Sequence, residues 1–408
     1  MYFRLVAADI THRSPSKVKV SSSSTNRRKI KSNNSIDFKD QNSDVYLNSL
    51  QLISKYGYTP EVQTVITSDG YLVKSYRIPN SGPPVLLVHG IGDSSDSWLV
   101  LGPSRSVAFQ LSDLGYDVWI YNARGNKYSQ GHVKNLNQKQ YWNFSNEEMG
   151  TEDLPALIDH ILLTTSQKRL SYIGFSQGTT NFLIMCSMRP EYNEKIKKAI
   201  LLAPVAWISN IKYPFMDVFA SNINLLYSFF NGIGVYNLFS DNVFLNLYHA
   251  KVCQDGVTGQ ILCALEFYIA YGIKNIKNLY PEKLPVLASH IPAGISTKTF
   301  VHFFQTYLSK RFQRYDYGSK ANQLIYSSPV PPNYNLSLVT APLYIFYSDS
   351  DWFSTTVDVK NLLSKLPNVV KYVNFNESLD FTHLEFIYGA RINSFINDKI
   401  KMILDNRL

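Results

Sequence analysis

The sequence has little charge, little cysteine and no long apolar run. Charged residues make up only 17% of the 408 residues and hydrophobic residues 45%, so the chain can bury a large core. Because no stretch reaches about 18 uninterrupted apolar residues, we predict no transmembrane helix. The N-terminus has no apolar segment before a cleavage site, so we predict no signal peptide. The histidines are scattered and no H-E-x-x-H or paired C-x-x-C occurs, so we expect no metal.

Cysteine is limited to Cys186, Cys253 and Cys263. Three thiols cannot all pair within one chain, so either two of them form a disulfide or none does. Asparagine occurs in a few Asn-x-Ser tripeptides, which are weak signals of N-glycosylation when they stand alone. These tripeptides begin at Asn33, Asn143, Asn335 and Asn376, and the last three are our candidate glycosylation sites.

The net charge of +9 is unevenly distributed along the chain. Residues 1–40 hold nine Lys and Arg against three Asp, which accounts for +6 of the total. The Ser, Lys and Arg composition predicts a disordered basic tail over residues 1–44. The rest of the chain is close to neutral and carries no nucleic-acid-binding motif, so we expect no nucleic-acid partner.

Apolar runs of strand length alternate with helical patterns along most of the chain. Strands are expected at Glu61–Thr67, Tyr71–Ile78, Pro84–Val88, Asp117–Tyr121, Leu170–Ile173, Ala199–Leu202, Pro342–Tyr347 and Val370–Val373. Helices are expected at residues 104–114, Glu152–Thr165, Asn181–Met188, Val357–Leu366 and Glu385–Leu404. This alternation predicts an α/β fold, with a mostly parallel sheet flanked by helices.

Residues 206–335 interrupt the alternation. They contain long aromatic segments such as Leu225–Asn231 and Leu265–Tyr271, without clear strands. An interruption between strands of one sheet is best explained by a cap inserted into a single catalytic domain. We therefore predict one core domain, built from residues 45–205 and 336–408, with an inserted and mainly helical cap at residues 206–335.

The strongest local signal for chemistry is Gly174-Phe175-Ser176-Gln177-Gly178. It fits G-x-S-x-G, the nucleophile elbow of the α/β-hydrolase fold. In this motif a sharp turn between a strand and a helix projects the serine hydroxyl above the sheet. Glycine is needed on both sides because a Cβ would collide with neighbouring chain. The expected strand before the motif and the expected helix after it provide this context, so Ser176 is the candidate nucleophile.

Chain order restricts the other two members of a catalytic triad, because in this fold the acid and then the histidine follow the serine. His383 lies in a loop between an expected strand and the last expected helix, whereas His249, His290 and His302 fall in the expected cap. The strand Pro342–Tyr347 leads into two aspartates that could orient the imidazole. Their position does not separate them: Asp349 and Asp351.

An oxyanion hole requires two backbone N–H groups aimed at the developing negative charge. In this fold one donor follows the nucleophile, which here is Gln177. The other comes from the loop after the strand Pro84–Val88, where His89-Gly90 leads into Ile91. We predict Ile91 and Gln177 as the two donors.

Many short pieces of the chain together resemble the acid lipases, the family of gastric and lysosomal acid lipases and their insect relatives. The resemblance runs from about Tyr46 to the C-terminus, and the insect-type members look most similar. The pieces include Tyr56-Gly57-Tyr58, Asp69-Gly70-Tyr71, Leu87-Val88-His89-Gly90, Asn122-Ala123-Arg124-Gly125-Asn126, Gly174–Thr180, Arg189-Pro190-Glu191-Tyr192-Asn193, Pro292-Ala293-Gly294, Tyr315-Asp316-Tyr317-Gly318 and His383-Leu384-Glu385-Phe386.

The resemblance implies roles for several residues. The family's aspartate before Trp or Leu matches Asp351, which favours Asp351 over Asp349 as the acid. The family's histidine matches His383, and its oxyanion residues match Ile91 and Gln177. A disulfide in the cap of relatives resembles the pair Cys253 and Cys263, which would leave Cys186 free. Relatives are secreted or lysosomal glycoproteins, which implies the same location here.

The chain also departs from the family pattern. Phe175 stands where the family usually has His, Ile91 where it has Leu, and Glu152 where it has Tyr. Ile91 would donate through its backbone, so this change need not affect activity, whereas Phe175 alters the packing under the elbow. The missing signal peptide departs from the location that the family implies.

Together these features predict a serine ester hydrolase, a lipase with Ser176, Asp351 and His383 as its triad. Its expected partner is a neutral lipid, such as a triacylglycerol or a sterol ester, at a lipid–water interface. No cofactor is expected. Two alternatives stay open: a carboxylesterase for small soluble esters, and a non-catalytic lipid-binding protein, which would typically have lost the serine or the histidine.

Overall fold

The computed structural model describes residues 42–408, apart from residues 215, 239–242 and 255. Most of the predicted basic tail, residues 1–41, lies outside the described residues. Its predicted end at residue 44 is wrong, because Asn42–Tyr46 forms a 3₁₀ helix, η1. Asp44 in this helix is fully buried and pairs with Lys283 and Lys55 at 2.9 Å each. These ion pairs hold the start of the domain in place.

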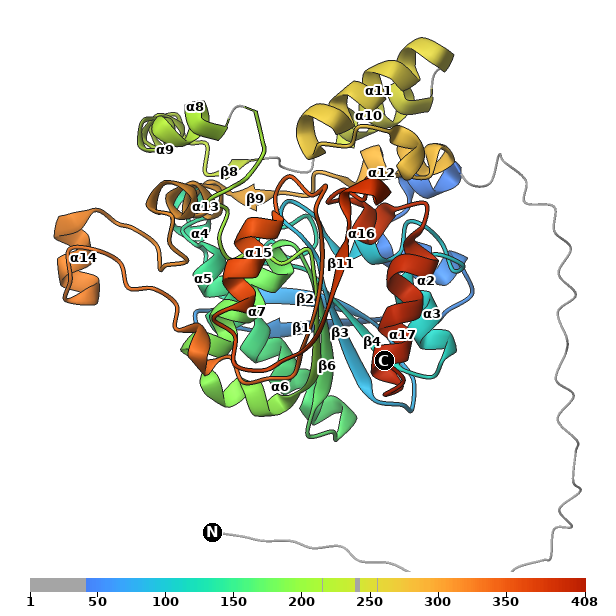
Figure 1. Cartoon of the computed structure of the whole chain (residues 1–408), viewed down its shortest axis with the longest axis horizontal. Helices are drawn as coiled ribbons and strands as arrows, with labels where there is room; N and C mark the ends of the chain where they lie inside the picture. The colour runs from blue at the N-terminus through green and yellow to red at the C-terminus, as the bar shows by residue number, and fades with distance from the viewer. Residues whose placement is uncertain (1–41, 215, 239–242, 255) are drawn as a thin grey trace, which may run out of the picture. The chain divides into compact units, whose positions relative to one another are not determined.

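A nine-stranded sheet forms the centre of the domain, in the order β1-β2-β4-β3-β6-β7-β10-β11, with β5 paired to β2 (Figure 1). The strands β1, β2 and β4 are antiparallel neighbours, and from β4 to β11 every pair is parallel. The mostly parallel sheet is therefore confirmed. The strands are β1 (Glu61–Ile66), β2 (Tyr71–Ile78), β3 (Pro84–Val88), β4 (Asp117–Tyr121), β5 (Gly131–His132), β6 (Leu170–Phe175), β7 (Ile196–Leu202), β10 (Leu343–Ser348) and β11 (Val369–Phe375).

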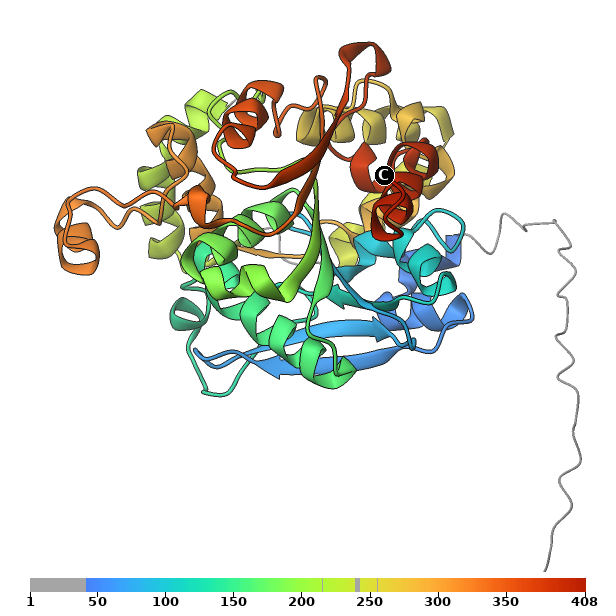
Figure 2. The same cartoon turned by 60° about the horizontal axis from the view of Figure 1, so that its bottom comes forward.

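Helices cover both faces of this sheet, as Figures 1 and 2 show. One face carries α2 (Ser49–Lys55), α3 (Val107–Asp113) and α17 (Asp398–Leu404), and the other carries α6 (Leu154–Thr165), α7 (Gln177–Met188) and α15 (Thr356–Leu363). Shorter helices are α4 (Gln138–Tyr141), α5 (Asn146–Glu148) and α16 (Glu385–Tyr388).

The apolar runs of the central strands are explained by burial on both sides. In β3, Val85 and Leu87 belong to one hydrophobic cluster, whereas Leu86 and Val88 belong to the other. Successive side chains of a strand point to opposite faces, so a strand covered on both faces must be apolar throughout. Each such buried aliphatic side chain contributes about 1.5–3 kcal/mol relative to exposure. The core therefore fixes the sheet on which the candidate site is built.

The segment between β7 and β10 is mainly helical. It contains α8 (Met216–Ser221), α9 (Ile223–Gly232), α10 (Val243–Gln254), α11 (Gly256–Tyr271), α12 (Leu284–His290), α13 (Thr297–Ser309) and α14 (Ser319–Tyr326), with a two-residue antiparallel pair of β8 (Asn237–Leu238) and β9 (Ile295–Ser296). In Figure 1 the helices α8 to α11 lie beyond one end of the sheet. Among the described residues, no helix is both long enough and apolar enough to cross a bilayer.

The single helix expected at Glu385–Leu404 is wrong, because the chain breaks it after α16. Gly389 forms an isolated bridge with Leu279, and Ala390 N–H donates to Asn278 O at 2.7 Å. The helix resumes as a π-turn at Asn393–Asn397 and then as α17. Backbone hydrogen bonds to the 276–280 segment replace those that a continuous helix would make here. The local periodicity of the sequence does not show such contacts with a distant segment.

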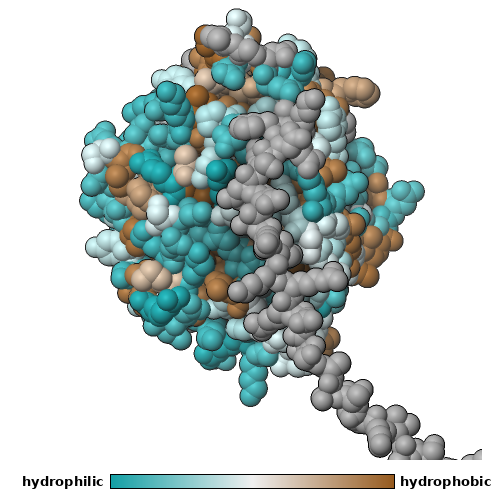
Figure 3. All heavy atoms as spheres, turned by 90° about the vertical axis from the view of Figure 1, so that its right-hand side faces the viewer, coloured by the Kyte–Doolittle hydropathy of each residue, from teal (hydrophilic) through white to brown (hydrophobic). Residues whose placement is uncertain are grey.

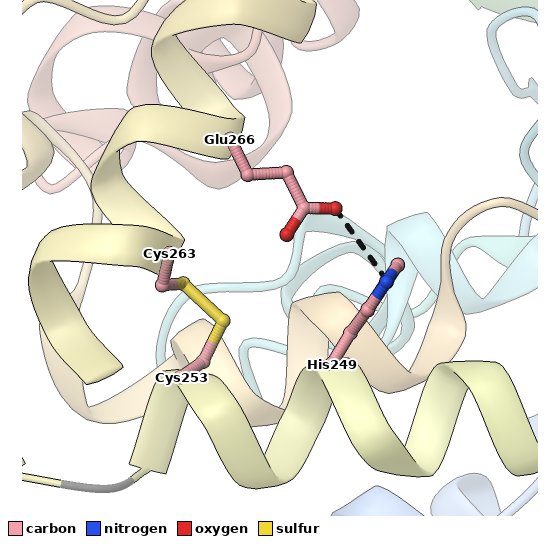
Figure 4. The surroundings of a disulfide bond; sticks show 4 residues. All are labelled: His249, Cys253, Cys263 and Glu266. Carbon is pink, nitrogen blue, oxygen red and sulfur yellow. Dashed lines mark ion pairs between the residues drawn. A yellow bond between two sulfur atoms is a disulfide. The ribbon is translucent and has the colours of Figure 1, made fainter.

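A disulfide links Cys253 in α10 to Cys263 in α11, with the two Cα atoms 5.1 Å apart (Figure 4). Beside it, His249 of α10 faces Glu266 of α11 at 3.4 Å, an ion pair when the imidazole is protonated. Cys186 is free and buried in α7, and burial raises the pKa of its thiol above the ordinary range. The disulfide therefore fixes the two helices of one hairpin to each other.

The pairing predicts the thiol count of the protein. Protein from its native source should show one reactive thiol after unfolding, that of Cys186, and three after reduction. Replacing both Cys253 and Cys263 by Ser should lower stability by at most about 3 kcal/mol, because the closed loop is short. Thiol titration with and without reductant measures the first effect, and denaturant unfolding the second. Three thiols before reduction would contradict the pairing and indicate a reducing compartment.

Candidate active site

Ser176 lies at a strained turn between β6 and α7. Its backbone has φ 51° and ψ −116°, a region that residues other than glycine rarely adopt. Its N–H donates to Leu202 O at 3.0 Å, which ties the turn to β7. An added Cβ on Gly174 would lie 3.0 Å from the backbone of Gly178, and one on Gly178 would lie 2.5 Å from Val88 O. Both glycines are thus needed for the close passage of the elbow past β3.

Two hydrogen bonds connect the three residues of the predicted triad. His383 Nε2 lies 2.9 Å from Ser176 Oγ, and His383 Nδ1 lies 2.7 Å from Asp351 Oδ2. These contacts match a serine that donates to Nε2 and an Nδ1–H that donates to the carboxylate. The arrangement brings together side chains from three separate parts of the chain.

The structure distinguishes the two aspartates that position in the sequence left equivalent. Asp351 is fully buried, and its Oδ1 accepts from the N–H groups of Phe353 and Ser354 at 2.8 and 3.0 Å. These bonds leave Oδ2 directed at His383. Asp349 instead accepts from Thr356 Oγ1 at 2.6 Å and from a side-chain amide of β11. Its contacts hold α15 and β11, away from the imidazole.

Aromatic rings confine the imidazole of His383. The ring of Phe175 lies 5.0 Å from it, centre to centre, and that of Phe353 lies 5.1 Å away. Phe175, one of the departures from the family pattern, therefore packs directly against the candidate base. Glu385 holds the loop, because its Oε2 accepts from Thr382 N–H at 2.7 Å. Glu385 belongs to the His383-Leu384-Glu385-Phe386 piece, but its sequence position alone does not indicate this contact with Thr382.

The two predicted oxyanion donors belong to two segments next to the serine. Gln177 is the first residue of α7, so its N–H has no partner within the helix. Ile91 belongs to the loop after β3, and Gly90 in this loop packs against Ser176: an added Cβ there would lie 3.3 Å from Ser176 Cβ. The loop therefore runs beside the nucleophile, where a backbone N–H of Ile91 could reach a tetrahedral oxygen. These assignments stay predictions.

His89 stabilises the start of this loop through two hydrogen bonds. His89 Nε2 accepts from Ala123 N–H at 3.1 Å, and His89 Nδ1 bonds to Gly90 O at 2.8 Å. The ring is buried, and burial lowers the pKa of His89 to about 4. A neutral imidazole with its proton on Nδ1 satisfies both bonds. His89 thus orients Gly90 and takes no part in the proton relay between Ser176 and Asp351.

The helical segment between β7 and β10 contacts the acid loop. Trp352, next to Asp351, packs against Gly272 so closely that an added Cβ would lie 2.4 Å from the indole, and its ring lies 5.6 Å from that of Tyr268. Ser176 and His383 are only 5% and 6% exposed. The catalytic atoms are therefore covered from solvent in this conformation.

A cavity of about 640 Å³ opens elsewhere, between α9, α13 and the 313–318 loop. Tyr227, Lys298 and Tyr315 are among its lining residues, whereas none of the triad is. It is thus separate from the candidate active site. Among the described residues, no three or more His, Cys, Asp or Glu side chains are grouped so as to hold a metal ion.

The candidate glycosylation sites are all exposed at the surface of the domain. Asn143, Asn335 and Asn376 each have a solvent-accessible side chain. Asn143 Oδ1 accepts from Lys298 Nζ at 3.1 Å, and the other two begin short 3₁₀ turns. Asn143 also lines the cavity of about 640 Å³, and Asn33 lies outside the described residues.

Comparison with known families agrees with the observed fold. Residues 83–386 match the family model described as alpha/beta hydrolase fold, and residues 50–102 match the partial alpha/beta-hydrolase lipase region. Among solved structures, DcsB in complex with its substrate analogue has a TM-score of 0.53 at 15% identity, covering 86% of this chain and 100% of that chain. At such low identity this likeness shows the fold alone.

Several curated relatives are similar over most of their length. Lipase 1 of Drosophila melanogaster is 36% identical over 87% of this chain and 79% of its own. Lipase 3 of the same species is 37% identical over 84% and 89%. Gastric triacylglycerol lipase of Bos taurus is 36% identical over 86% and 89%. The similarity to these relatives thus includes both the sheet with its flanking helices and the helical segment between β7 and β10.

The first of four predictions about activity concerns Ser176. Replacing it by Ala removes the only hydroxyl within 2.9 Å of His383 Nε2 that the described residues provide, so turnover of an ester should fall roughly 10⁴–10⁶-fold. The circular dichroism spectrum and melting temperature should change little, because Ala keeps the Cβ and the substitution removes only the hydroxyl that contacts His383. Near-normal turnover in purified, folded S176A would contradict the assignment.

The second prediction separates the two aspartates. Asp351→Asn should lower turnover by roughly 10³–10⁴-fold, because an amide can neither select the required tautomer nor stabilise the imidazolium. Asp349→Asn, the matched control in the same loop, should cost less than about threefold. Steady-state kinetics on a soluble ester compares the two, and equal losses would show that the acid has been assigned to the wrong residue.

Proposed function

The chain belongs to the α/β-hydrolase fold family and, within it, to the lipases, and we propose that Ser176 is the nucleophile with which this lipase cleaves carboxylic esters of neutral lipids. The hydrogen-bonded series from Ser176 Oγ through His383 to Asp351 carries this proposal. The substrates are triacylglycerols or sterol esters, in keeping with relatives named gastric triacylglycerol lipase.

The proposed reaction proceeds in two halves. Ser176 Oγ attacks the ester carbonyl while His383 Nε2 takes its proton, and the N–H groups of Ile91 and Gln177 stabilise the oxyanion. Each such donor is worth about 10²–10³ in rate. His383 then returns the proton to the leaving alcohol, which leaves an acyl group on Ser176. Water, activated by the same histidine, releases the fatty acid, and Asp351 orients the imidazole throughout.

A lipid surface as the place of action is supported by the side chains that the cap exposes. We define the cap as residues 206–335. Many large apolar side chains of α8 to α11 remain exposed in the described part of the domain. They are Val218, Phe219, Leu225, Phe229, Phe244, Tyr248, Ile261, Leu262, Leu265, Tyr268 and Ile269. Such a concentration on one part of a chain is typical of an interaction site. Figure 3 shows a face where polar and apolar side chains are interspersed.

The cap also explains how a covered serine can meet its substrate. Because Ser176 is only 5% exposed and Trp352 packs against Tyr268 of α11 and against Gly272, we infer that a long acyl chain reaches the serine by displacing cap helices or by passing between them. We propose that the α10–α11 hairpin, held by the Cys253–Cys263 disulfide, moves as a unit at a lipid surface. Its apolar side chains would then contact lipid instead of water.

We also propose that the protein is secreted or lysosomal. A disulfide persists in oxidising compartments, and three exposed Asn-x-Ser sites are available for glycans. Both features fit the resemblance to the acid lipases. Glycosidase treatment of protein from its native source, read out by mass spectrometry, tests this location, and an unmodified chain with three free thiols would contradict it.

The third prediction tests the cap with a matched pair of variants. Leu265 on α11 is 50% exposed and Leu163 on α6, outside the cap, is 82% exposed, so Asp can replace either one without unfolding the core. Leu265→Asp should lower turnover of an emulsified long-chain triacylglycerol at least about fivefold more than that of a short soluble ester. Leu163→Asp should leave both activities unchanged.

The activities of these two variants on the two substrates also decide between a lipase whose cap binds the acyl chain and an esterase for small esters. Both substrates should be measured at acidic and neutral pH, with unfolding curves for each variant. Parallel losses on the two substrates in folded Leu265→Asp, or a wild-type enzyme that leaves the emulsion untouched, would favour the small-ester esterase.

A further inference from the structure

A buried carboxyl group lies next to the predicted oxyanion loop and has no part in the proton relay. Asp93 follows Ile91 by two residues, and its side chain is almost entirely shielded from solvent. Its Oδ1 accepts from Ser94 N–H at 2.7 Å, and its Oδ2 accepts from the Tyr388 hydroxyl at 2.8 Å. Burial of a carboxyl group costs free energy of folding unless hydrogen bonds or loss of its charge compensate.

The partner of Asp93 belongs to the segment that carries His383. Tyr388 closes α16, and its N–H donates to Leu384 O at 2.8 Å, one residue beyond the histidine. Tyr388 is itself buried. The hydrogen bond between Tyr388 and Asp93 therefore spans 295 positions of sequence and joins the base-bearing segment to the oxyanion loop.

The remaining backbone of this loop is restrained from other directions. Gly92 O accepts from Ala293 N–H at 2.7 Å, and Asp93 O is 3.4 Å from Asn126 Nδ2. Gly92 has φ +65°, so the turn at this point depends on glycine. These contacts fix the end of the loop that follows Ile91, and the Tyr388 hydrogen bond adds a restraint from the segment that carries His383.

We propose that Asp93 is a positioning residue of the ester-hydrolysis reaction, which holds the oxyanion loop at a fixed distance from the His383 segment through Tyr388 and which works best in its neutral form. The proposal rests on the proposed function of Ser176. An error of about 1 Å in such a donor can cost on the order of 10²-fold in rate.

Charged groups of both signs lie near Asp93. Asp96 on η2 (Ser95–Trp98) opposes ionisation of Asp93, whereas Lys127 favours it. Lys127 and His290 of α12 both lie 2.7 Å from Asp96 Oδ2, and although burial raises the pKa of Asp96, these contacts hold it below its ordinary value. Two tyrosines face Asp93 from other elements, Tyr388 of α16 and Tyr271 of α11.

Burial is the main reason that the pKa of Asp93 is raised to about 7. Below this pH the carboxyl is neutral, whereas above it a negative charge stands beside the loop that must stabilise an oxyanion, and the two charges repel. The same shift affects stability: the contribution from neutral Asp93 is fully present below pH 4, the range of an unfolded Asp, and is lost as the pH rises through about 7. Activity should therefore fall on the alkaline side.

The fourth prediction uses three variants of the full chain, assayed on a short soluble ester from pH 4 to 9. Asp93→Asn can keep its oxygen for Ser94 N–H while its Nδ2–H donates to the Tyr388 oxygen, and it cannot ionise. It should therefore retain wild-type kcat at pH 5 within about twofold and exceed it about fivefold at pH 8.5. Asp93→Ala and Tyr388→Phe should lower kcat at pH 5 about tenfold or more, with KM within about threefold.

A matched Tyr–Asp pair elsewhere in the fold provides the control. Tyr58 OH donates to Asp113 Oδ1 at 2.9 Å at the surface, and Tyr58→Phe or Asp113→Asn should leave the pH profile unchanged. A pH profile of Asp93→Asn identical to that of the wild type, together with normal kcat in Tyr388→Phe, would overturn the inference. The Ser176→Ala variant separates this outcome from failure of the proposed function, because that variant alone reports on the nucleophile.

Discussion

The hydrogen bond between His383 Nε2 and Ser176 Oγ joins residues that are 207 positions apart. It can form because β3, β6, β7 and β10 are consecutive parallel neighbours in the sheet, so that the loops at their carboxyl ends meet at one edge of the sheet. The loop after β3 carries Gly90, the turn after β6 carries Ser176, and the loop after β10 carries Asp351. The two-sided apolar core that holds these strands is thus a condition for the chemistry.

Much of this architecture could be predicted from the sequence, because its causes are local or periodic. Strand-length apolar runs reflect burial on both faces of the sheet, and the glycines around Ser176 reflect a close approach of backbones. The fold class and the family are confirmed. Chain order limited the choice of base and acid, and the family resemblance favoured Asp351. Position alone did not separate Asp349 from Asp351, because the partner that distinguishes Asp351, His383, lies 32 positions away.

What the sequence could not predict depends on contacts between distant segments. The break after α16 arises because Leu279 and Asn278 bond to the backbone there. The burial of Asp44 depends on Lys283, and the pairing of Asp93 with Tyr388 crosses most of the chain. Buried polar groups of this kind need partners, and these partners are set by the fold, not by spacing in the sequence.

The central claim is that Ser176 becomes acylated by its substrate. The most direct measurement treats the protein with a p-nitrophenyl alkylphosphonate, which a serine activated by histidine attacks and which cannot be released by water at a comparable rate. Peptide mass spectrometry should then find about one phosphonyl group per chain, on the peptide that contains Ser176, together with complete loss of ester hydrolysis. Full hydrolytic activity with no adduct, or an adduct on another residue that accounts for the loss, would contradict the account.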